Sequence, residues 1–275
     1  MPNKKRKGTT YPMIQAIIFD LDNTLYWDEK SNDEALAATC LIASNNVTTI
    51  SAPKLKDDVI HQAELQFKAS PFFEFAHSLE ITALETLWAR FDVEDHSQFE
   101  MIRNQAPEFR FNVWNAALQS SGHNDSHLAA FLAERYLEER RERAYIYEDM
   151  METLTSLHSQ YRLLLLTNGT PDLQQEKVDS VPGLASFFEH IVISGDFGIG
   201  KPSESIFQHA IDLLALRRNE VVMVGDNLYT DILGASRSGI SNIWINRSSG
   251  SRPDHIFPTH EVESLSELYS LIQSL

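Results

Sequence analysis

The chain contains the run AIIFDLDNTL at residues 16–25, in which an apolar, β-prone segment leads directly into two carboxylates, Asp20 and Asp22, and a hydroxyl, Thr24. Charged groups at the end of a buried strand cost free energy, so a chain that keeps them there usually uses them. We predict a strand over residues 13–19, with the Asp20 carboxylate projecting from its carboxyl edge. Open α/β sheets bind their ligands at that edge.

Asp20 and Asp22 form a pair whose spacing favours two different protonation states. Neighbouring carboxylates repel each other, and a bound divalent cation together with partial burial could leave one ionised while the other holds a proton. The ionised group would be a nucleophile and the protonated group a general acid/base. The pattern Asp-x-Asp-x-Thr also arises by chance, so its meaning depends on the rest of the chain.

Three further polar elements follow, two of them at the ends of apolar, strand-like runs. They are Thr167-Asn168-Gly169, Lys201-Pro202 and Gly225-Asp226-Asn227-Leu228-Tyr229-Thr230-Asp231. The first ends the run 162–166 and the third ends the run 221–224. Each element alone is ordinary turn or helix-cap chemistry. Their order, with helical segments between them, predicts one site at the edge of a parallel sheet.

The order of helices and strands favours an α/β fold, a Rossmann-like parallel sheet core with helices on both faces. After residue 146 the two alternate, with later strands expected at 191–193, 221–224 and 242–245 and a last helix over 265–275.

Between residues 27 and 143 helical spacing replaces the strand-like runs. We therefore predict an α/β core domain of residues 1–26 and 145–275, interrupted by an all-helical domain of residues 27–144. Three prolines are expected to punctuate the helical domain, namely Pro53, Pro71 and Pro107.

In these four motifs, taken in order from about residue 13 to residue 246, the chain resembles the haloacid dehalogenase-like (HAD) hydrolase superfamily. It looks most like the phosphatase branch, in which a helical, C1-type cap closes over the site. The resemblance implies that Asp20 attacks phosphorus and forms an aspartyl-phosphate. It also implies that Asp22 protonates the leaving alcohol and then activates water.

The resemblance assigns functions to the other motif residues as well. Lys201 would neutralise charge on the nucleophile and the phosphate, and Thr167 would complete the catalytic set. Phosphoryl oxygens would be bound by Thr167, Asn168, Gly169 and Lys201. Mg²⁺ would be bound by the carboxylates of Asp20 and Asp226 and the main-chain carbonyl of Asp22, with Thr24, Asn227 and Asp231 in support.

The residue types agree with this chemistry independently of the family. Phosphoryl transfer depends on positioning and charge compensation, which a cation, a lysine and backbone donors supply. Oxygen ligands without a His/Cys cluster suit a hard ion, so Mg²⁺ is favoured over zinc. The sequence therefore predicts a Mg²⁺-dependent phosphatase for a small phosphomonoester, such as a sugar phosphate, an acylneuraminate phosphate or a nucleoside monophosphate.

Two alternatives stay open at this point. A phosphomutase would use the same residues, and a non-catalytic binding module could keep the fold, although such a module has no need for two adjacent acids. The resemblance also disfavours a dehalogenase, because it implies that dehalogenase members lack an acid/base aspartate at the position of Asp22. The glycines and lysine of residues 195–201 have P-loop spacing, but Pro202 stands where a Mg²⁺-binding Ser or Thr should follow.

The composition restricts partners and location. A formal net charge of −16 over 275 residues argues against nucleic-acid binding by the body of the protein. The basic run Lys4-Lys5-Arg6-Lys7 is interpreted as a solvated terminus, and the single cysteine, Cys40, as a packing residue. With neither a signal peptide nor an apolar run long enough to cross a bilayer, we expect a cytoplasmic enzyme with no membrane partner.

Substrate selection is expected to depend on the helical insertion. Tyr26 and Trp27 follow the catalytic loop closely enough to line the entrance of the site. Arg110 is a candidate anion contact on a helix of the insertion.

Overall fold

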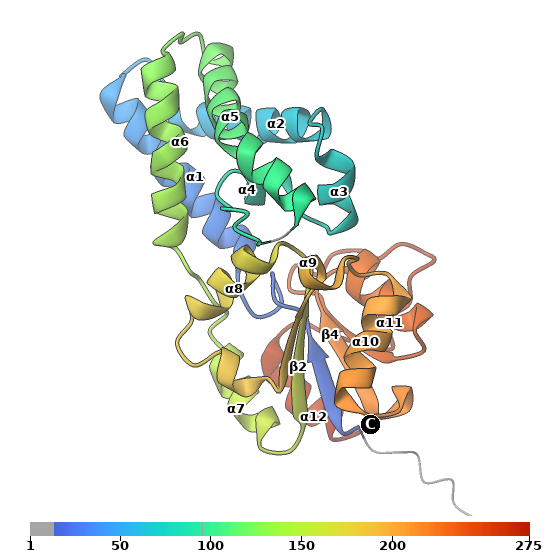
Figure 1. Ribbon diagram of the computed structural model, residues 1–275. Helices are drawn as coiled ribbons and strands as arrows, with labels where there is room; N and C mark the ends of the chain where they lie inside the picture. The colour runs from blue at the N-terminus through green and yellow to red at the C-terminus, as the bar shows by residue number, and fades with distance from the viewer. Residues whose placement is uncertain (1–13, 95) are drawn as a thin grey trace, which may run out of the picture.

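A six-stranded parallel sheet forms the centre of the computed structural model, which describes residues 14–94 and 96–275 (Figure 1). The strand order is β3-β2-β1-β4-β5-β6. The strands are β1 (Ala16–Phe19), β2 (Arg162–Thr167), β3 (His190–Ile193), β4 (Val221–Gly225), β5 (Ser241–Ile245) and β6 (His260–Val262). Because β1 pairs in parallel with both β2 and β4, the ends of these three strands lie together at one edge of the sheet. This confirms the predicted Rossmann-like α/β class.

Alternate side chains of each strand face opposite layers of helices. In β1, Ile17 and Phe19 pack with α7 (Met150–His158) and α12 (Leu268–Ile272). Ala16 and Ile18 pack on the other face with α10 (Glu204–Leu214) and α11 (Leu233–Arg237). Helices therefore cover both faces of the sheet. This explains why the strand sequences are continuous apolar runs and do not alternate between apolar and polar residues.

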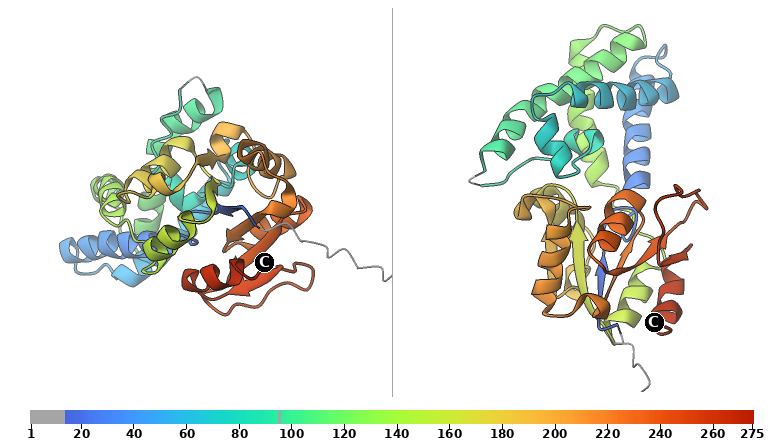
Figure 2. Two further views of the ribbon diagram at one scale, coloured as in Figure 1. Left: turned by 90° about the horizontal axis from the view of Figure 1, so that it is seen from below. Right: turned by 90° about the vertical axis from the view of Figure 1, so that its right-hand side faces the viewer.

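Seven helices of the described residues lie between β1 and β2, and Figures 1 and 2 show the first six of them beyond the carboxyl ends of the strands. We call residues 27–144 the helical region. Its helices are α1 (Asp28–Asn46), α2 (Ala52–Lys68), α3 (Phe73–Ser78), α4 (Ala83–Thr86), α5 (Ser97–Ser120) and α6 (Ser126–Arg141). The region has its own apolar core, with Trp88 and Trp114 among its largest buried side chains. The division of the chain into two domains at these boundaries stays a prediction.

The remaining short elements lie before or after the strands. They are α8 (Pro171–Asp179), α9 (Ser194–Phe197), the 3₁₀ turns Ala185–Phe187, Arg218–Glu220 and Leu265–Glu267, and a π-helical turn, Leu228–Ile232. Of these, α8 directly follows β2, and the π-helical turn follows β4. Each therefore begins close to a predicted site motif.

The structure differs from the sequence-based expectations in several local features. Strand β6 was not expected, because three residues at a sheet edge carry too short a pattern to recognise. The last helix is shorter than residues 265–275 and begins at Leu268 after a 3₁₀ turn. The first strand is described from Ala16, whereas Met13 and the basic run at residues 4–7 lie outside the described residues.

Pro107 does not punctuate the helical region as expected, because it lies inside the long helix α5. Its side chain is exposed, whereas Ala106 and Phe109 beside it are buried. The packing of this buried face against the rest of the helical region outweighs the helix-breaking tendency of one exposed proline. Pro53, in contrast, lies in the first turn of α2, where a missing N–H costs little.

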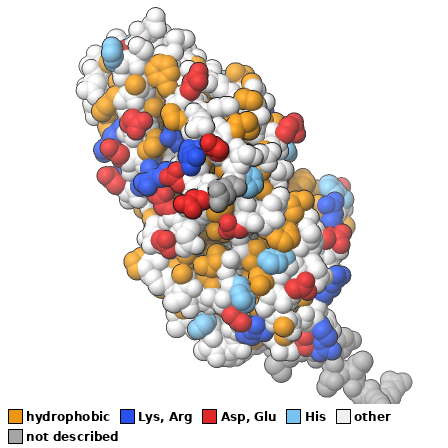
Figure 3. All heavy atoms as spheres, in the orientation of Figure 1, with side chains coloured by type: hydrophobic (Ala, Val, Ile, Leu, Met, Phe, Trp, Pro, Cys, Tyr) orange, Lys and Arg blue, Asp and Glu red, His pale blue; other side chains and the backbone are white. Residues whose placement is uncertain are grey.

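Within residues 14–94 and 96–275, none of the helices is both long and apolar enough to cross a bilayer. On the face seen in Figure 3, acidic side chains lie among the basic ones, so this face carries no continuous basic surface. A phosphate backbone would need such a surface.

Cys40 is expected to resist thiol reagents as long as the chain is folded. Its side chain lies in the core of the helical region, is fully buried, and burial raises its pKa to about 12. Because the thiolate is the reactive form, alkylation by iodoacetamide at neutral pH should be at least about tenfold slower than in denaturant. Mass spectrometry of the alkylated protein measures both rates. Equal rates would contradict the described packing.

Candidate active site

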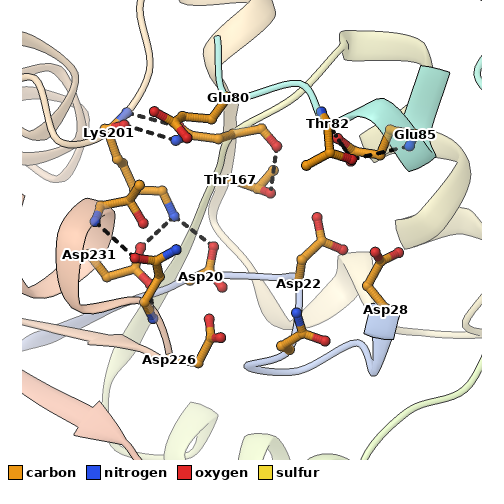
Figure 4. Close-up of a pocket in the computed structure, with 14 residues that line it drawn as sticks. Asp20, Asp22, Asp28, Glu80, Thr82, Glu85, Thr167, Lys201, Asp226 and Asp231 are labelled. Atoms are coloured by element: carbon orange, nitrogen blue, oxygen red, sulfur yellow. Dashed lines mark hydrogen bonds and ion pairs between the residues drawn. The ribbon is translucent and has the colours of Figure 1, made fainter. Parts of the chain in front are cut away.

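The loop after β1 places two carboxylates over the end of the sheet. The main-chain N–H of Asp20 still donates to Val224 O at 3.0 Å, so Asp20 continues the pairing of β1 with β4. The chain then turns at Asn23, which has a positive φ of 59°. Asn and Asp tolerate this left-handed conformation better than most residues. The turn directs the Asp22 side chain to the same edge as Asp20 (Figure 4).

A buried lysine joins the first and last motifs. Lys201 Nζ donates to Asp20 Oδ1 at 2.6 Å and to Asp231 Oδ1 at 2.7 Å, and all three residues are buried. Burial would lower the pKa of Lys201, but the two carboxylates outweigh it and hold that pKa above its usual value. Burial also raises the pKa of Asp20 to about 6, against the opposing effect of Lys201. Lys201 and Asp20 therefore form a charged contact that is shielded from water, and electrostatic attraction is stronger in such a low-dielectric environment.

Asn168 holds Lys201 in place through the main chain. Its amide oxygen accepts from Lys201 N at 2.8 Å, and its amide nitrogen donates to Lys201 O at 3.0 Å. A lysine in a loop between β3 and α10 thereby gains a fixed position next to the end of β2. The third motif, at Lys201, and the second, at residues 167–169, meet through this contact.

Asp226, from the end of β4, faces Asp20 across a small acidic cluster. One carboxylate oxygen from each of Asp20, Asp226 and Asp231 can lie within 4.8 Å of the others. Burial raises the pKa of Asp226 well above its usual value, and the Asp20 charge adds to this effect. Thr24 ties the cluster to the first loop, because its hydroxyl accepts from Asp226 N at 3.1 Å and donates to Asp226 Oδ1 at 3.4 Å.

This cluster fits a hard divalent cation. Its donors are all carboxylate oxygens, which Mg²⁺ prefers. Both oxygens of Asp231 are already engaged, one by Lys201 Nζ and one by Asn227 N at 3.1 Å. Among the described residues, Asp226 has one oxygen without a hydrogen-bond donor, and so does Asp20. These two carboxylates are therefore the ones best placed to reach an ion.

Asp22 is held by two side chains that the sequence-based reasoning missed. Lys177 Nζ donates to both Asp22 oxygens at 2.9 Å, and Gln174 Nε2 donates to Asp22 Oδ2 at 2.8 Å. Burial, opposed by Lys177, raises the pKa of Asp22 to about 7. The available signal was a glutamine and a lysine three positions apart on the helix that follows the second motif.

Two residues of the second motif line the pocket, and the third bonds to a neighbouring loop instead. Thr167, the last residue of β2, and Asn168 line the pocket. Gly169 is not among the described lining residues, and its N–H donates to Ser194 Oγ at 2.9 Å. Gly169 thus helps to hold the loop in place, and its expected contact with substrate stays a prediction.

These groups surround a pocket of about 180 Å³ between the sheet edge and the helical region. Typical sites for drug-sized ligands occupy roughly 300–1,000 Å³, so this pocket suits a small substrate. The described lining residues are Asp20, Asp22, Asn23, Asp28, Glu80, Thr82, Glu85, Thr167, Asn168, Lys201, Asp226, Asn227, Thr230 and Asp231. Figure 4 shows Asp28 beside Asp22, and Glu80, Thr82 and Glu85 above them on the helical region.

Tyr26 and Trp27, expected at the entrance, and Arg110, expected to contact an anion, lie elsewhere. Tyr26 is buried and its hydroxyl accepts from Arg140 at 3.0 Å, while Trp27 stacks on Tyr147 with ring centroids 4.9 Å apart. Arg110 is buried in the helical region and donates to the carbonyls of Thr86 and Ala89. None of the three is among the described residues that line the pocket, because each side chain is engaged by other partners.

The fold and the site together define a hydrolase of the HAD type. The sequence model of the haloacid dehalogenase-like hydrolase family matches residues 14–239 of the chain, which therefore belongs to this family. Phosphoserine phosphatase of Thermus thermophilus is 35% identical over 257 residues, covering 93% of this chain and 98% of that protein. N-acylneuraminate-9-phosphatase of Rattus norvegicus is 37% identical over 175 residues, covering 61% of this chain and 69% of the rat protein.

With relatives of this kind the chain is a phosphoric monoester hydrolase. Among solved structures, the HAD-hydrolase YfnB from Bacillus subtilis bound to magnesium has a TM-score of 0.61 and 22% identity. The match covers 94% of this chain and 99% of that one, and it supports the shared fold.

Proposed function

We propose that the chain is a Mg²⁺-dependent phosphatase that hydrolyses a small phosphorylated metabolite through an aspartyl-phosphate on Asp20. One observation carries the proposal: Asp20, Lys201, Asp226 and Asp231 form one contact network at the edge of the pocket that also contains Asp22. Three separate segments contribute to it, namely the loop after β1, the loop that carries Lys201 and the turn after β4.

The charges in the pocket argue for a metal ion. Of the described lining residues, seven carry carboxylates, and Lys201 alone carries a positive charge. A phosphomonoester dianion would be repelled by such a lining unless a cation offset it. Mg²⁺ held by Asp20 and Asp226, with the Asp22 carbonyl proposed as a further ligand, would compensate charge on the phosphoryl oxygens.

The protein residues then divide the reaction between them. A carboxylate oxygen of Asp20 forms a bond to phosphorus while the bond from phosphorus to the leaving oxygen breaks. Asp22 gives its proton to the leaving oxygen, and then takes one from the water that cleaves the acyl-phosphate, which returns Asp20 to its starting state. Lys201, Thr167 and Asn168 are placed to stabilise the charge on the transferred group.

Substrate choice is proposed to depend on the helical region acting as a cap domain over the core of residues 1–26 and 145–275. Asp28, Glu80, Thr82 and Glu85 bring this region to the pocket. A sugar phosphate, an acylneuraminate phosphate and a nucleoside monophosphate remain the substrate classes to test, and the Thermus thermophilus relative adds phosphoserine. A cytoplasmic location also stays a prediction.

Removal of divalent metal is expected to abolish turnover. Hydrolysis of 4-nitrophenyl phosphate should fall more than about 20-fold when EDTA is added, because the anion then meets an uncompensated acidic lining. Excess Mg²⁺ in the same sample should restore the rate, which excludes damage by the chelator. Equal rates with and without EDTA would contradict the metal assignment.

A panel of phosphorylated metabolites would identify the substrate class. The cap selects among leaving groups, so its preference appears as differences in kcat/KM between panel members.

A further inference from the structure

Lys177 of α8 is fully buried beside the active-site pocket and has no part in the chemistry proposed above. Its ammonium donates to both oxygens of Asp22 at 2.9 Å and to Glu85 Oε1 at 3.0 Å. Asp28 Oδ1 lies 3.3 Å from the same nitrogen. Carboxylates from three separate segments thus meet at one cation, and charge-assisted contacts of this kind are strong and restrictive.

The two outer partners of Lys177 are themselves held in place. Glu85 Oε2 accepts from the main-chain N–H of Thr82 at 2.9 Å, and Thr82 Oγ1 accepts from the main-chain N–H of Glu85 at 3.1 Å, so the two residues form the capping box of α4. Asp28, the first residue of α1, is paired with Arg140 at 2.5 Å. Glu85 and Asp28 therefore hold the Lys177 ammonium in place, and the ammonium in turn fixes the position of the Asp22 carboxylate.

Gln174 acts on the same carboxylate from one turn earlier in α8. Its Nε2 donates to Asp22 Oδ2 at 2.8 Å and to Thr167 Oγ1 at 2.7 Å, and the residue is fully buried. Residues three apart on a helix share a face, so Gln174 and Lys177 approach Asp22 together. Gln174 thereby links Asp22 to the threonine at the end of β2.

We propose that Lys177 is a positioning residue for Asp22, and that with Gln174 it holds the Asp22 carboxylate in the orientation needed to reach the leaving oxygen. This rests on the proposed function, in which Asp22 is the general acid/base. Neither α8 residue is among the described residues that line the pocket, so both act through Asp22. Because Lys177 also binds Asp28 and Glu85, the placement of Asp22 depends on α1 and α4 of the helical region.

The test compares two substrates of similar shape whose leaving groups differ. 4-Nitrophenyl phosphate releases a stable anion and needs little protonation, whereas phenyl phosphate needs more help from a general acid. Asp22→Asn should therefore lower kcat/KM for phenyl phosphate at least about tenfold more than for 4-nitrophenyl phosphate. Lys177→Met is expected to show the same selective loss with Asp22 intact, because a misplaced acid fails where protonation matters. A purely structural effect would lower both values equally.

Arg141→Gln is the matched control. Arg141 of α6 joins the helical region to α8 through Glu176 at 2.6 Å, so its loss disturbs the same boundary without touching Asp22. It should lower kcat/KM for both substrates by the same factor. Thermal unfolding followed by circular dichroism reports whether each variant is folded.

Two failures can be distinguished. If Asp22→Asn shows no leaving-group selectivity, the proposed role of Asp22 is wrong. If Asp22→Asn is selective but folded Lys177→Met is not, the positioning role is wrong. Lys177→Met removes the cation that the buried Glu85 shares with the partly buried Asp22 and Asp28, so this variant could fail to fold. In that case Gln174→Leu is the deciding variant. Its kcat/KM for phenyl phosphate should fall about threefold more than its kcat/KM for 4-nitrophenyl phosphate. An equal fall for both substrates would overturn the proposal.

Discussion

Asp20→Asn should lower kcat/KM by more than about 10³-fold while the protein stays folded. The amide of Asn cannot form the acyl-phosphate, so the covalent route is lost and not merely slowed. The fold should tolerate the change, because an Asn Oδ1 can still accept the hydrogen bond that Lys201 Nζ donates at 2.6 Å. Burial disfavours the charged form of Asp20, and the substitution removes that charge.

Three measurements check this expectation. Steady-state phosphate release from 4-nitrophenyl phosphate gives kcat/KM, thermal unfolding gives stability, and mass spectrometry of protein quenched during turnover detects a phosphorylated peptide containing residue 20 in the parent chain alone. Asp33→Asn is the matched control, because Asp33 is an exposed aspartate of α1 paired with Lys56. It should leave kcat/KM unchanged. A folded Asp20→Asn variant with more than a few per cent of parental activity would remove Asp20 from the role of nucleophile.

Lys201→Met should have the second largest effect, on both activity and stability. It removes the only positive charge among the described lining residues, so kcat/KM should fall by about 10²–10³-fold. It also leaves Asp20 and Asp231 buried side by side without their cation. Breaking a buried pair in this way costs about 3–5 kcal/mol of unfolding free energy.

Mg²⁺ should recover part of that stability, because an ion bound to Asp20 and Asp226 would replace some of the missing positive charge. Urea unfolding of the variant with EDTA or with Mg²⁺ measures this recovery. Lys56→Met is the control for loss of a lysine, since Lys56 is partly exposed and pairs with the exposed Asp33, and pairs open to solvent contribute about 0–1 kcal/mol. A folded Lys201→Met variant that keeps more than about one tenth of kcat/KM would contradict the assigned charge compensation.

Much of the site could be predicted from the sequence because its residues follow strand ends. Asp20, Thr167 and Asp226 each come at or directly after a buried run, and β1 pairs with both β2 and β4. Parallel strands end at one edge, so the order of the motifs was enough to predict that these residues meet. At these positions the site predicted from strand-end residues is the one that the strand order of the sheet forms.

Other features depended on contacts that no local pattern records. Lys177 and Gln174 reach Asp22 across more than 150 residues of sequence, and Arg110 turns into the helical region to bind carbonyls. Side chains of these three types are mostly exposed to solvent, so the sequence alone predicts that each one on a helix is solvated.

The sequence was therefore sufficient for the α/β sheet, its helical insertion and the residues at the strand ends, since periodicity and chain order carry that information. Tertiary structure was needed to find which polar side chains are buried and what they hold. Burial depends on which distant segments pack together, and that packing decides whether a charged side chain faces water or orients the acid at residue 22.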